Sequence, residues 1–248
     1  MEKLDLEYFE KVESNEKLHN ILKYSRENFI PTMLTHTGKL LYRYVSKLKP
    51  KSILEIGTAI GYSGIVMLIA SDTMSHITTI EKNEERVILA KNNFKECNLS
   101  DNVDVLQGDA SEIINDIHYQ IINKNNKIAN NNTCNNEIKS CTENKIDMNE
   151  IKSQKYDFIF LDGSKSQYIK QIDMLLDILN DNGVIFIDDA LYMYSVYKEG
   201  DVPHKHRAMI KNLRNFVVKI LDNEDIGKEI FNYDEGIIIV TKQSKLHK

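Results

Sequence analysis

The chain has 248 residues, of which 42% are hydrophobic and 28% are charged, and its formal net charge at pH 7 is −5. This composition predicts a soluble globular protein with a substantial core. The length fits one large α/β domain or two small ones, and we expect a single domain over residues 1–248. The negative net charge excludes a surface that is basic throughout, as a non-specific nucleic-acid binder would have, but it allows a local basic patch.

Cysteine content and hydropathy indicate the compartment. The three cysteines, Cys97, Cys134 and Cys141, predict no disulfide framework. No apolar run approaches the ~20 residues of a transmembrane helix, and residues 1–5 contain no apolar signal core. We therefore expect a cytoplasmic protein with reduced thiols and no membrane partner.

The first 48 residues are expected to form N-terminal helices. Apolar residues recur at helical spacing within 4–28, which predicts two amphipathic helices with a break near Ser14 and Asn15. A third helix is expected over 34–48. The apolar stripe of 4–28 lies outside the expected sheet, so it needs a surface to cover it.

The chain is organised around residues 53–64, I-L-E-I-G-T-A-I-G-Y-S-G. A short apolar run opens this stretch and predicts a buried parallel strand. Gly57, Gly61 and Gly64 follow, and then a helix-like apolar run. Strand, glycine turn and helix are typical of a nucleotide-binding first unit, although the spacing matches neither the dinucleotide motif nor the P-loop. A turn that only lets the helix pack on the strand is the alternative.

The second strand is expected over 76–81, which is rich in β-branched residues. It ends in Glu81, 24 residues beyond Gly57. A carboxylate at this place accepts hydrogen bonds from ribose hydroxyls. Alternatively, Glu81 caps the helix expected over 83–98.

The third strand is expected over 103–107, and Gly108-Asp109-Ala110 follows it. Asp109 lies just beyond the carboxyl end of this strand, where open parallel sheets bind ligands. It can equally be the N-cap of a helix over 110–122, and the two roles are compatible.

Residues 123–152 differ in kind from the rest. Eight of the fourteen residues 123–136 are Asn, and no apolar periodicity is visible. Such a segment is too polar to order itself, so we expect a low-complexity insertion at the surface. Cys134 and Cys141 lie inside it at a spacing that suits no zinc motif.

Two more parallel strands and an intervening helix are predicted beyond the insertion. The fourth strand covers 156–162, the helix 165–179 and the fifth strand 184–187. A basic helix over 203–221 follows. Residues 229–231 and 237–241 then form a closing pair of strands, and antiparallel strands at the edge of a parallel sheet are common.

Three carboxylates end the fourth and fifth strands: Asp162, Asp188 and Asp189. Ligands of an open parallel sheet bind beyond these strand ends. Converging carboxylates repel unless a positive charge lies among them, and Mg²⁺ or Mn²⁺ with oxygen ligands would supply it. Lys165, one helical turn from Asp162, could add another. The alternative is that the three acids are separate caps and turn residues.

Three motifs resemble one enzyme family. Residues 54–57, L-E-I-G, look like motif I of the S-adenosylmethionine (SAM) methyltransferases. Residues 162–168, D-G-S-K-S-Q-Y, resemble the D-A-x-K-x-x-Y motif of the metal-dependent class I O-methyltransferases, the catechol and caffeoyl-CoA O-methyltransferase group, and Asp188-Asp189 resembles its D-N pair. Residues 54–63 are similar to the bacterial branch, which includes the tRNA 5-hydroxyuridine methyltransferases.

The resemblance covers about 29–242 without the insertion. It implies a Rossmann-like, doubly wound, seven-stranded and mostly parallel α/β sheet with an antiparallel closing strand, helices on both faces and extra N-terminal helices. It also implies SAM and Mg²⁺ or Mn²⁺ as cofactors, and a homodimer with the N-terminal helices at the interface. The implied cofactor-binding residues are Glu55, Gly57, Gly61, Ser63, Glu81, Asp109, Ala110 and Asp162. The implied metal ligands are Asp162, Asp188 and Asp189, and the implied catalytic residues are Lys165 and Asp162.

The sequence departs from the family at two places, of which the first bears on the metal and the second on the acceptor. Asp189 stands where the family usually has Asn, and residues 204–207, H-K-H-R, are less basic than the arginine cluster of the bacterial branch. The expected activity is O-methylation of 5-hydroxyuridine in tRNA. The alternatives are O-methylation of a catechol-like or acyl-CoA-linked phenol, and a non-catalytic SAM- or RNA-binding module.

Overall fold

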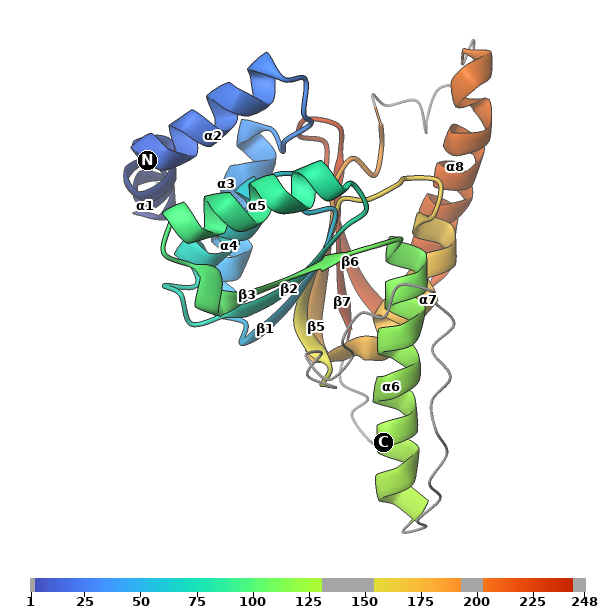
Figure 1. Ribbon diagram of the computed structural model, residues 1–248. Helices are drawn as coiled ribbons and strands as arrows, with labels where there is room; N and C mark the ends of the chain where they lie inside the picture. Colours follow the sequence, from blue (N-terminus) through green and yellow to red (C-terminus); the bar gives the residue numbers. More distant parts are fainter. Residues whose placement is uncertain (1–2, 131–153, 193–202, 243–248) are drawn as a thin grey trace.

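The computed structural model describes residues 3–130, 154–192 and 203–242, and these form one seven-stranded sheet in the order β3-β2-β1-β4-β5-β7-β6 (Figure 1). Strands β1 to β5 are parallel, and β7 lies antiparallel between β5 and β6. The predicted fold class is therefore confirmed. The strands are β1 (Ser52–Ile56), β2 (His76–Glu81), β3 (Val103–Gln107), β4 (Tyr156–Leu161), β5 (Leu179–Ile187), β6 (Ile226–Phe231) and β7 (Ile237–Lys242).

Helices cover both faces of the sheet (Figure 1). One face carries α1 (Lys3–Tyr8), α2 (Glu16–Glu27), α3 (Thr35–Leu48), α4 (Tyr62–Ala70) and α5 (Glu84–Glu96). The other carries α6 (Ala110–Asn130), α7 (Tyr168–Ile178) and α8 (Arg207–Asp222). Each group of helices shares one apolar cluster with the sheet face below it. No helix of the described ranges is long and apolar enough to cross a membrane.

The ends of the central strands are aligned. The last residues of β1, β4 and β5 pair with one another across the sheet. The backbone N–H of Asp162 donates to the carbonyl of Ile56 at 2.9 Å, and that of Asp188 donates to the carbonyl of Leu161 at 3.0 Å. Gly57, Asp162 and Asp188 therefore lie side by side at the carboxyl edge of the sheet.

The N-terminal segment packs on its own domain. A π-helix (Phe9–Glu13) joins α1 to the break at Ser14 and Asn15, as predicted, and the Asn15 side chain caps α2. Four apolar side chains of the segment are buried: Tyr8, Val12, Leu18 and Ile21. The chain thus covers its own apolar stripe, which removes the reason for an interface there, while the homodimer itself stays a prediction.

The predicted insertion begins too early. Helix α6 runs to Asn130 instead of Ile122, so 123–130 are helical and only 131–152 lie outside the described residues, with Cys134 and Cys141. The first half of α6 buries isoleucines such as Ile117 and Ile121. A helix anchored in this way propagates readily into polar residues, because each added residue gains a backbone hydrogen bond after nucleation.

Two boundaries around the fourth strand also differ from the prediction. Helix α7 begins at Tyr168, three residues after Lys165, because 163–167 form a turn over the end of β1. Strand β5 begins at Leu179 rather than Val184 and includes the Asn182-Gly183 turn signal. Helix α7 leads directly into β5, and periodicity alone does not predict this.

Candidate active site

A cavity of about 630 Å³ lies beyond the carboxyl ends of strands β1 to β5. Each of these strands contributes a residue at or just after its end: Gly57, Glu81, Asp109, Asp162 and Asp188. The volume is in the range of small-molecule sites, and the position is where open α/β sheets bind ligands. The sequence-predicted strand-end residues are thus brought together.

The glycine turn fits tightly over β4. Gly57 has φ +104°, and a Cβ on it would lie 2.3 Å from the carbonyl oxygen of Asp162. Only glycine meets both conditions. The turn also continues through Ala59, a non-glycine residue at φ +45°. Glycine here is therefore required by the backbone and leaves the turn open to the cavity.

Glu81 holds this turn from the end of β2. One carboxylate oxygen accepts from the Ala59 N–H and the other from the Asn83 N–H, each at 2.9 Å. Asn83 itself is the N-cap of α5, since its side chain accepts from the Arg86 N–H. Glu81 thus supports the start of α5 through Asn83, in partial agreement with the alternative that it caps this helix. It also lines the cavity, where its carboxylate can accept hydrogen bonds from ribose hydroxyls.

Glu55 lies beneath the turn, in a buried polar network. Its carboxylate accepts from the hydroxyls of Ser63 and Thr79, each at 2.5 Å. Burial raises the pKa of Glu55 to about 7, although these two hydrogen bonds act to lower it. Glu55, Ser63 and Gly61, which packs against Phe94, do not line the cavity. Their contact with a cofactor remains a prediction, and their observed role is to support the turn.

Asp109 forms the far wall with Ala110. One carboxylate oxygen accepts from the Ser111 N–H at 2.9 Å, which gives the expected cap of α6, and the other pairs with Lys82 at 3.0 Å. The hydrogen bond from Lys82 holds the pKa of Asp109 below its ordinary value. Asp109 is thus a charged residue whose two oxygens are both occupied.

The opposite end of the cavity is acidic. Burial raises the pKa of Asp162 well above its ordinary value, and the charges of Asp188 and Asp189 raise it further. Burial also raises the pKa of Asp188 to about 7. Lys165 pairs with Asp189 at 2.6 Å. Burial acts to lower the pKa of Lys165, but the neighbouring carboxylates outweigh it and the pKa is raised, so the ammonium form is favoured.

The metal prediction is supported by donor chemistry and not by a ready-made cluster. Asp162, Asp188 and Asp189 offer only oxygen ligands, which suit Mg²⁺ or Mn²⁺. In the described ranges, however, no three His, Cys, Asp or Glu side chains are arranged to hold a metal ion. Asp189 is paired with Lys165 instead. A metal would have to share that carboxylate with the lysine.

A methyltransferase domain family matches residues 54–190. The chain belongs to this family. The match runs from β1 to the residues just after β5, and so it contains every predicted cofactor, catalytic and metal residue. It stops before the two closing strands and begins after the N-terminal helices.

Curated relatives match this chain at low identity. Caffeoyl-CoA O-methyltransferase 1 of Arabidopsis thaliana is 24% identical over 191 residues, which are 77% of this chain and 62% of that protein. The enzyme of Medicago sativa is 24% identical over 195 residues, 77% of this chain and 65% of that protein. The chain thus spans a little under two thirds of these curated relatives.

Two solved structures superpose on this chain along most of their length. The Bacillus cereus O-methyltransferase with S-adenosylhomocysteine (SAH) has a TM-score of 0.71, 20% identity, and coverage of 93% of this chain and 92% of that one. TomG of Streptomyces achromogenes with SAM has a TM-score of 0.71, 20% identity, and coverage of 98% and 100%. At this identity the likeness supports the fold alone.

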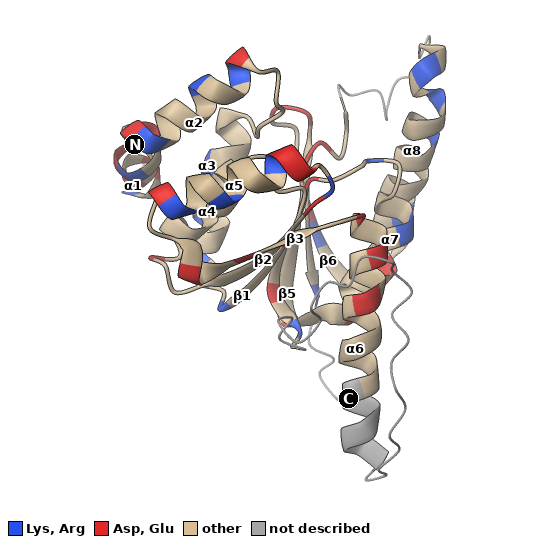
Figure 2. Cartoon of the chain, in the orientation of Figure 1, with Lys and Arg blue, Asp and Glu red and all other residues tan. Residues whose placement is uncertain are grey.

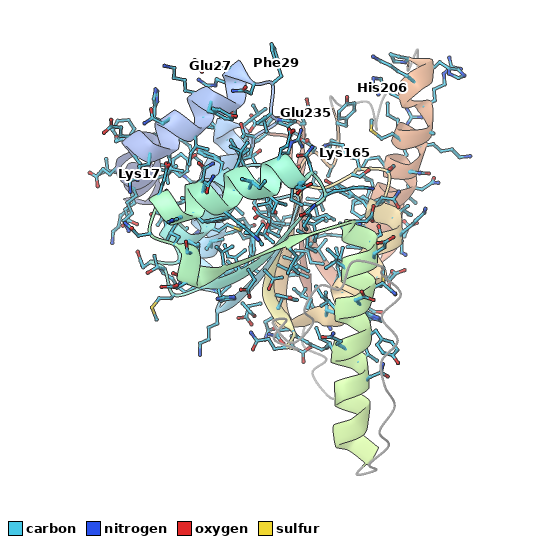
Figure 3. The ribbon with its side chains drawn as sticks, viewed as in Figure 1. Lys17, Glu27, Phe29, Lys165, His206 and Glu235 are labelled. Atoms are coloured by element: carbon cyan, nitrogen blue, oxygen red, sulfur yellow. The ribbon has the colours of Figure 1, made fainter. Side chains whose placement is uncertain are left out.

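Some cavity residues lie outside the family match, and sequence reasoning missed their role. Residues 31–34 precede α3, and Glu235 lies in the turn between β6 and β7. Figure 3 shows Glu235 near Lys165 at the acidic end. Burial and the charge of Asp189 raise the pKa of Glu235. These residues come from segments without strand-end signals, so only the three-dimensional fold brings them to the cavity.

Proposed function

We propose that this protein is a SAM-dependent O-methyltransferase. The observation that carries the proposal is one cavity with two chemically distinct ends. Glu81 and Asp109 lie at one end, as a nucleoside cofactor requires, and the pair Lys165–Asp189 lies at the other with Asp162. Gly57 lies between them, against Asp162. The names of the relatives, several of them O-methyltransferases, point the same way.

The orphaned oxygen of a buried glutamine, Gln171 Oε1, supports a ligand at the cofactor end, because it has no partner among the described residues. When bound, SAM supplies an electrophilic methyl group. Glu81 would accept from the ribose hydroxyls and hold the turn at Ala59 at the same time. Gly57, which has no side chain, would leave room in the cavity for the sulfur of SAM.

Lys165 is the residue we assign to the acceptor. Its ammonium lies among buried carboxylates, with the side chain 16% exposed. There it would stabilise the negative charge that develops on the acceptor oxygen as the hydroxyl loses its proton. A divalent cation held by Asp162, Asp188 and Asp189 would lower the pKa of that hydroxyl when bound. Lys165 would then act as an electrostatic partner rather than as a base.

We propose 5-hydroxyuridine in tRNA as the acceptor. Helix α8 carries several basic side chains, visible in Figure 2, which could meet phosphates. The helix begins beside the cavity, directly after His206. The rings of His206 and Tyr192 are 6.2 Å apart, and Tyr192 lines the cavity. Lys165 lies 5.9 Å from the same Tyr192 ring. The basic helix thus begins beside the acidic end of the cavity.

A small phenol is the second candidate acceptor. The segment 31–34 lines the cavity with Pro31, Met33 and Leu34, and Leu34 is 53% exposed. Such apolar side chains suit an aromatic ring. The curated relatives above are caffeoyl-CoA O-methyltransferases by name.

Methyl transfer from labelled SAM tests both acceptors. The protein is incubated with total tRNA or with a panel of catechols, with and without Mg²⁺. Lys165→Met should abolish transfer, whereas Lys23→Met, which removes an exposed lysine far from the cavity, should retain it. Labelled tRNA supports the first acceptor and labelled catechol the second. SAM binding without transfer to either would favour the non-catalytic module.

A further inference from the structure

Among the described residues, the carbonyl oxygen of Gln171 is the buried side-chain atom without a hydrogen-bond partner. Gln171 lies in the first turn of α7 and is only 2% exposed. Its amide is held in place, because Nε2 donates to the Ser111 hydroxyl at 3.1 Å. The structure therefore fixes an acceptor and leaves it unused.

The residue that carries this unused acceptor lies in the wall of the cavity. Gln171 and Ser111 both line it, next to Asp109 and Ala110. A buried carbonyl without a partner costs free energy, so native proteins usually satisfy such a group with a ligand or an ordered water. A ligand at this end of the cavity can satisfy Gln171 by presenting a hydrogen-bond donor.

The base of a nucleoside is the part of the proposed cofactor that reaches this wall. Glu81, at the end of β2, is the ribose acceptor, and Asp109 and Ser111 follow the next strand of the sheet. Adenine carries one N–H donor group that is free in a nucleoside, the 6-amino group, while its ring nitrogens N1, N3 and N7 are acceptors. The chemistry of an orphan acceptor thus selects the 6-amino group.

Asp109 is the competing acceptor, and it differs from Gln171 in already having a partner on each oxygen. One of its oxygens accepts from the Ser111 N–H and the other from Lys82. The Lys82 ammonium offsets the negative charge that would otherwise attract an amino group. The Gln171 oxygen has neither kind of partner.

We propose that Gln171, held by Ser111, is a specificity-determining residue that accepts a hydrogen bond from the 6-amino group of the cofactor adenine. This inference rests on the proposed function and adds a recognition element from α7. It predicts discrimination between adenine and hypoxanthine, which carries a carbonyl oxygen in place of the amino group and would meet the Gln171 oxygen with a second acceptor.

Calorimetric binding of SAH and of its hypoxanthine analogue, S-inosylhomocysteine, tests the proposal. The wild-type protein should bind SAH on the order of 10-fold to 100-fold more tightly, the range expected when a buried acceptor is left unpaired. In Gln171→Met, which keeps the side-chain length but not the acceptor, the two affinities should become nearly equal. Gln171→Glu restores acceptor oxygens and should restore the preference for SAH.

Two further variants control the test. Gln107→Met changes an exposed glutamine at the end of β3 and should leave the affinity ratio unchanged. Ser111→Ala frees the amide and should reduce the ratio, which keeps the proposal testable if Gln171→Met does not fold.

Equal wild-type affinities for the two ligands, or an unchanged ratio in Gln171→Met and Ser111→Ala, would overturn the inference and leave the proposed function intact. Absence of SAH binding to the wild-type protein would overturn both.

Discussion

Glu55 shows how a motif residue can serve the cavity without entering it. It is fully buried, and it is bonded to Ser63 on α4 and Thr79 on β2. Those bonds join the strand before the glycine turn to the helix after it. The sequence marked Glu55 by its place in the motif, but a pattern of letters does not tell a side chain that contacts a ligand from one that lies behind the turn.

The raised pKa of Glu55 predicts a pH-dependent stability. The group titrates near 4.5 in its ordinary state and near 7 in the folded protein, so the folded state keeps the proton longer than the unfolded one. Its contribution is fully present below pH 4.5 and is lost as the pH rises to 7. This loss amounts to about 3 kcal/mol at most. Glu55→Gln cannot titrate and should lack it.

Urea denaturation of both proteins at pH 5 and pH 8 measures this difference. The free energy of unfolding of the wild type, relative to Glu55→Gln, should be lower at pH 8 than at pH 5. A difference that stays constant between the two pH values would show that the carboxyl group is ionised throughout.

At the scale of elements, the strand ends were predictable and the helix ends were not. Apolar runs and acidic residues after them located β1 to β5, because buried parallel strands have a strong signal. Helix α6 extends beyond the expected boundary since burial of Ile121 anchors it, and polar residues do not stop a helix. The start of α7 was missed because 163–167 fold over Ile56, a long-range contact of Gly163.

The start of α3 depends on a distant residue. Its N-cap position is Leu34, whose side chain makes no capping hydrogen bond. The carboxylate of Asp234, in the turn between β6 and β7, accepts instead from the Thr37 N–H at 2.8 Å and the Thr37 hydroxyl at 3.0 Å. The same hydroxyl lies 3.4 Å from Asp188. Asp234 thus ties α3 to the acidic end of the cavity.

Loss of this contact should destabilise the protein. We expect Asp234→Ala to lower the free energy of unfolding by about 1–3 kcal/mol, because two buried donors of Thr37 lose their acceptor. His36→Ala is the matched control. It removes the His36 partner of Asp234, and the His36 side chain is 68% exposed. The free energy of unfolding should therefore fall by less than about 1 kcal/mol. Equal losses in the two variants, measured by urea denaturation, would contradict the capping role.

At the scale of the whole molecule, the cavity joins segments that the sequence keeps far apart. One cavity is lined by residues 31–34, Lys165 and Glu235. Residues 31–34 precede the family match, Lys165 lies within it, and Glu235 follows it. The cofactor end follows from strand order, which hydrophobic patterning predicts. The acceptor end depends on how the termini of the domain close over the sheet, and no local pattern encodes that closure.

The part of the predicted insertion beyond α6 should be dispensable. Its sequence is polar and aperiodic, and shortening such a connection changes closure entropy little. Replacing 131–152 by about ten Gly and Ser residues, enough to reach about 30 Å, should leave SAH affinity and unfolding free energy within about 1 kcal/mol. A longer deletion from residue 119 removes buried Ile121 and should destabilise the protein. Equal effects of both deletions would show that 131–152 has a structural role.

Methyl transfer should depend on a divalent metal while cofactor binding does not. Asp162, Asp188, Asp189 and Glu235 face one cationic side chain, Lys165, as the mutual effects on their pKa values indicate. A bound divalent cation would offset the remaining negative charge and favour the acceptor oxyanion. EDTA should therefore abolish transfer, and Mg²⁺ or Mn²⁺ should restore it. The calorimetric SAH affinity should change by no more than about threefold, which is under 1 kcal/mol of binding free energy.

Two neighbouring carboxylates should respond differently to the same substitution. Asp188 is only 3% exposed, and Asp188→Asn removes its charge. The rate of methyl transfer should fall by roughly 100-fold or more, because a bound metal supplies several kcal/mol of transition-state stabilisation. Both variants keep an amide oxygen, but Asp189→Asn restores the residue usual in the family, so its loss should be about tenfold or less. Transfer that survives EDTA, or Asp188→Asn with the wild-type rate, would mean that these acids only cap and brace the strand ends.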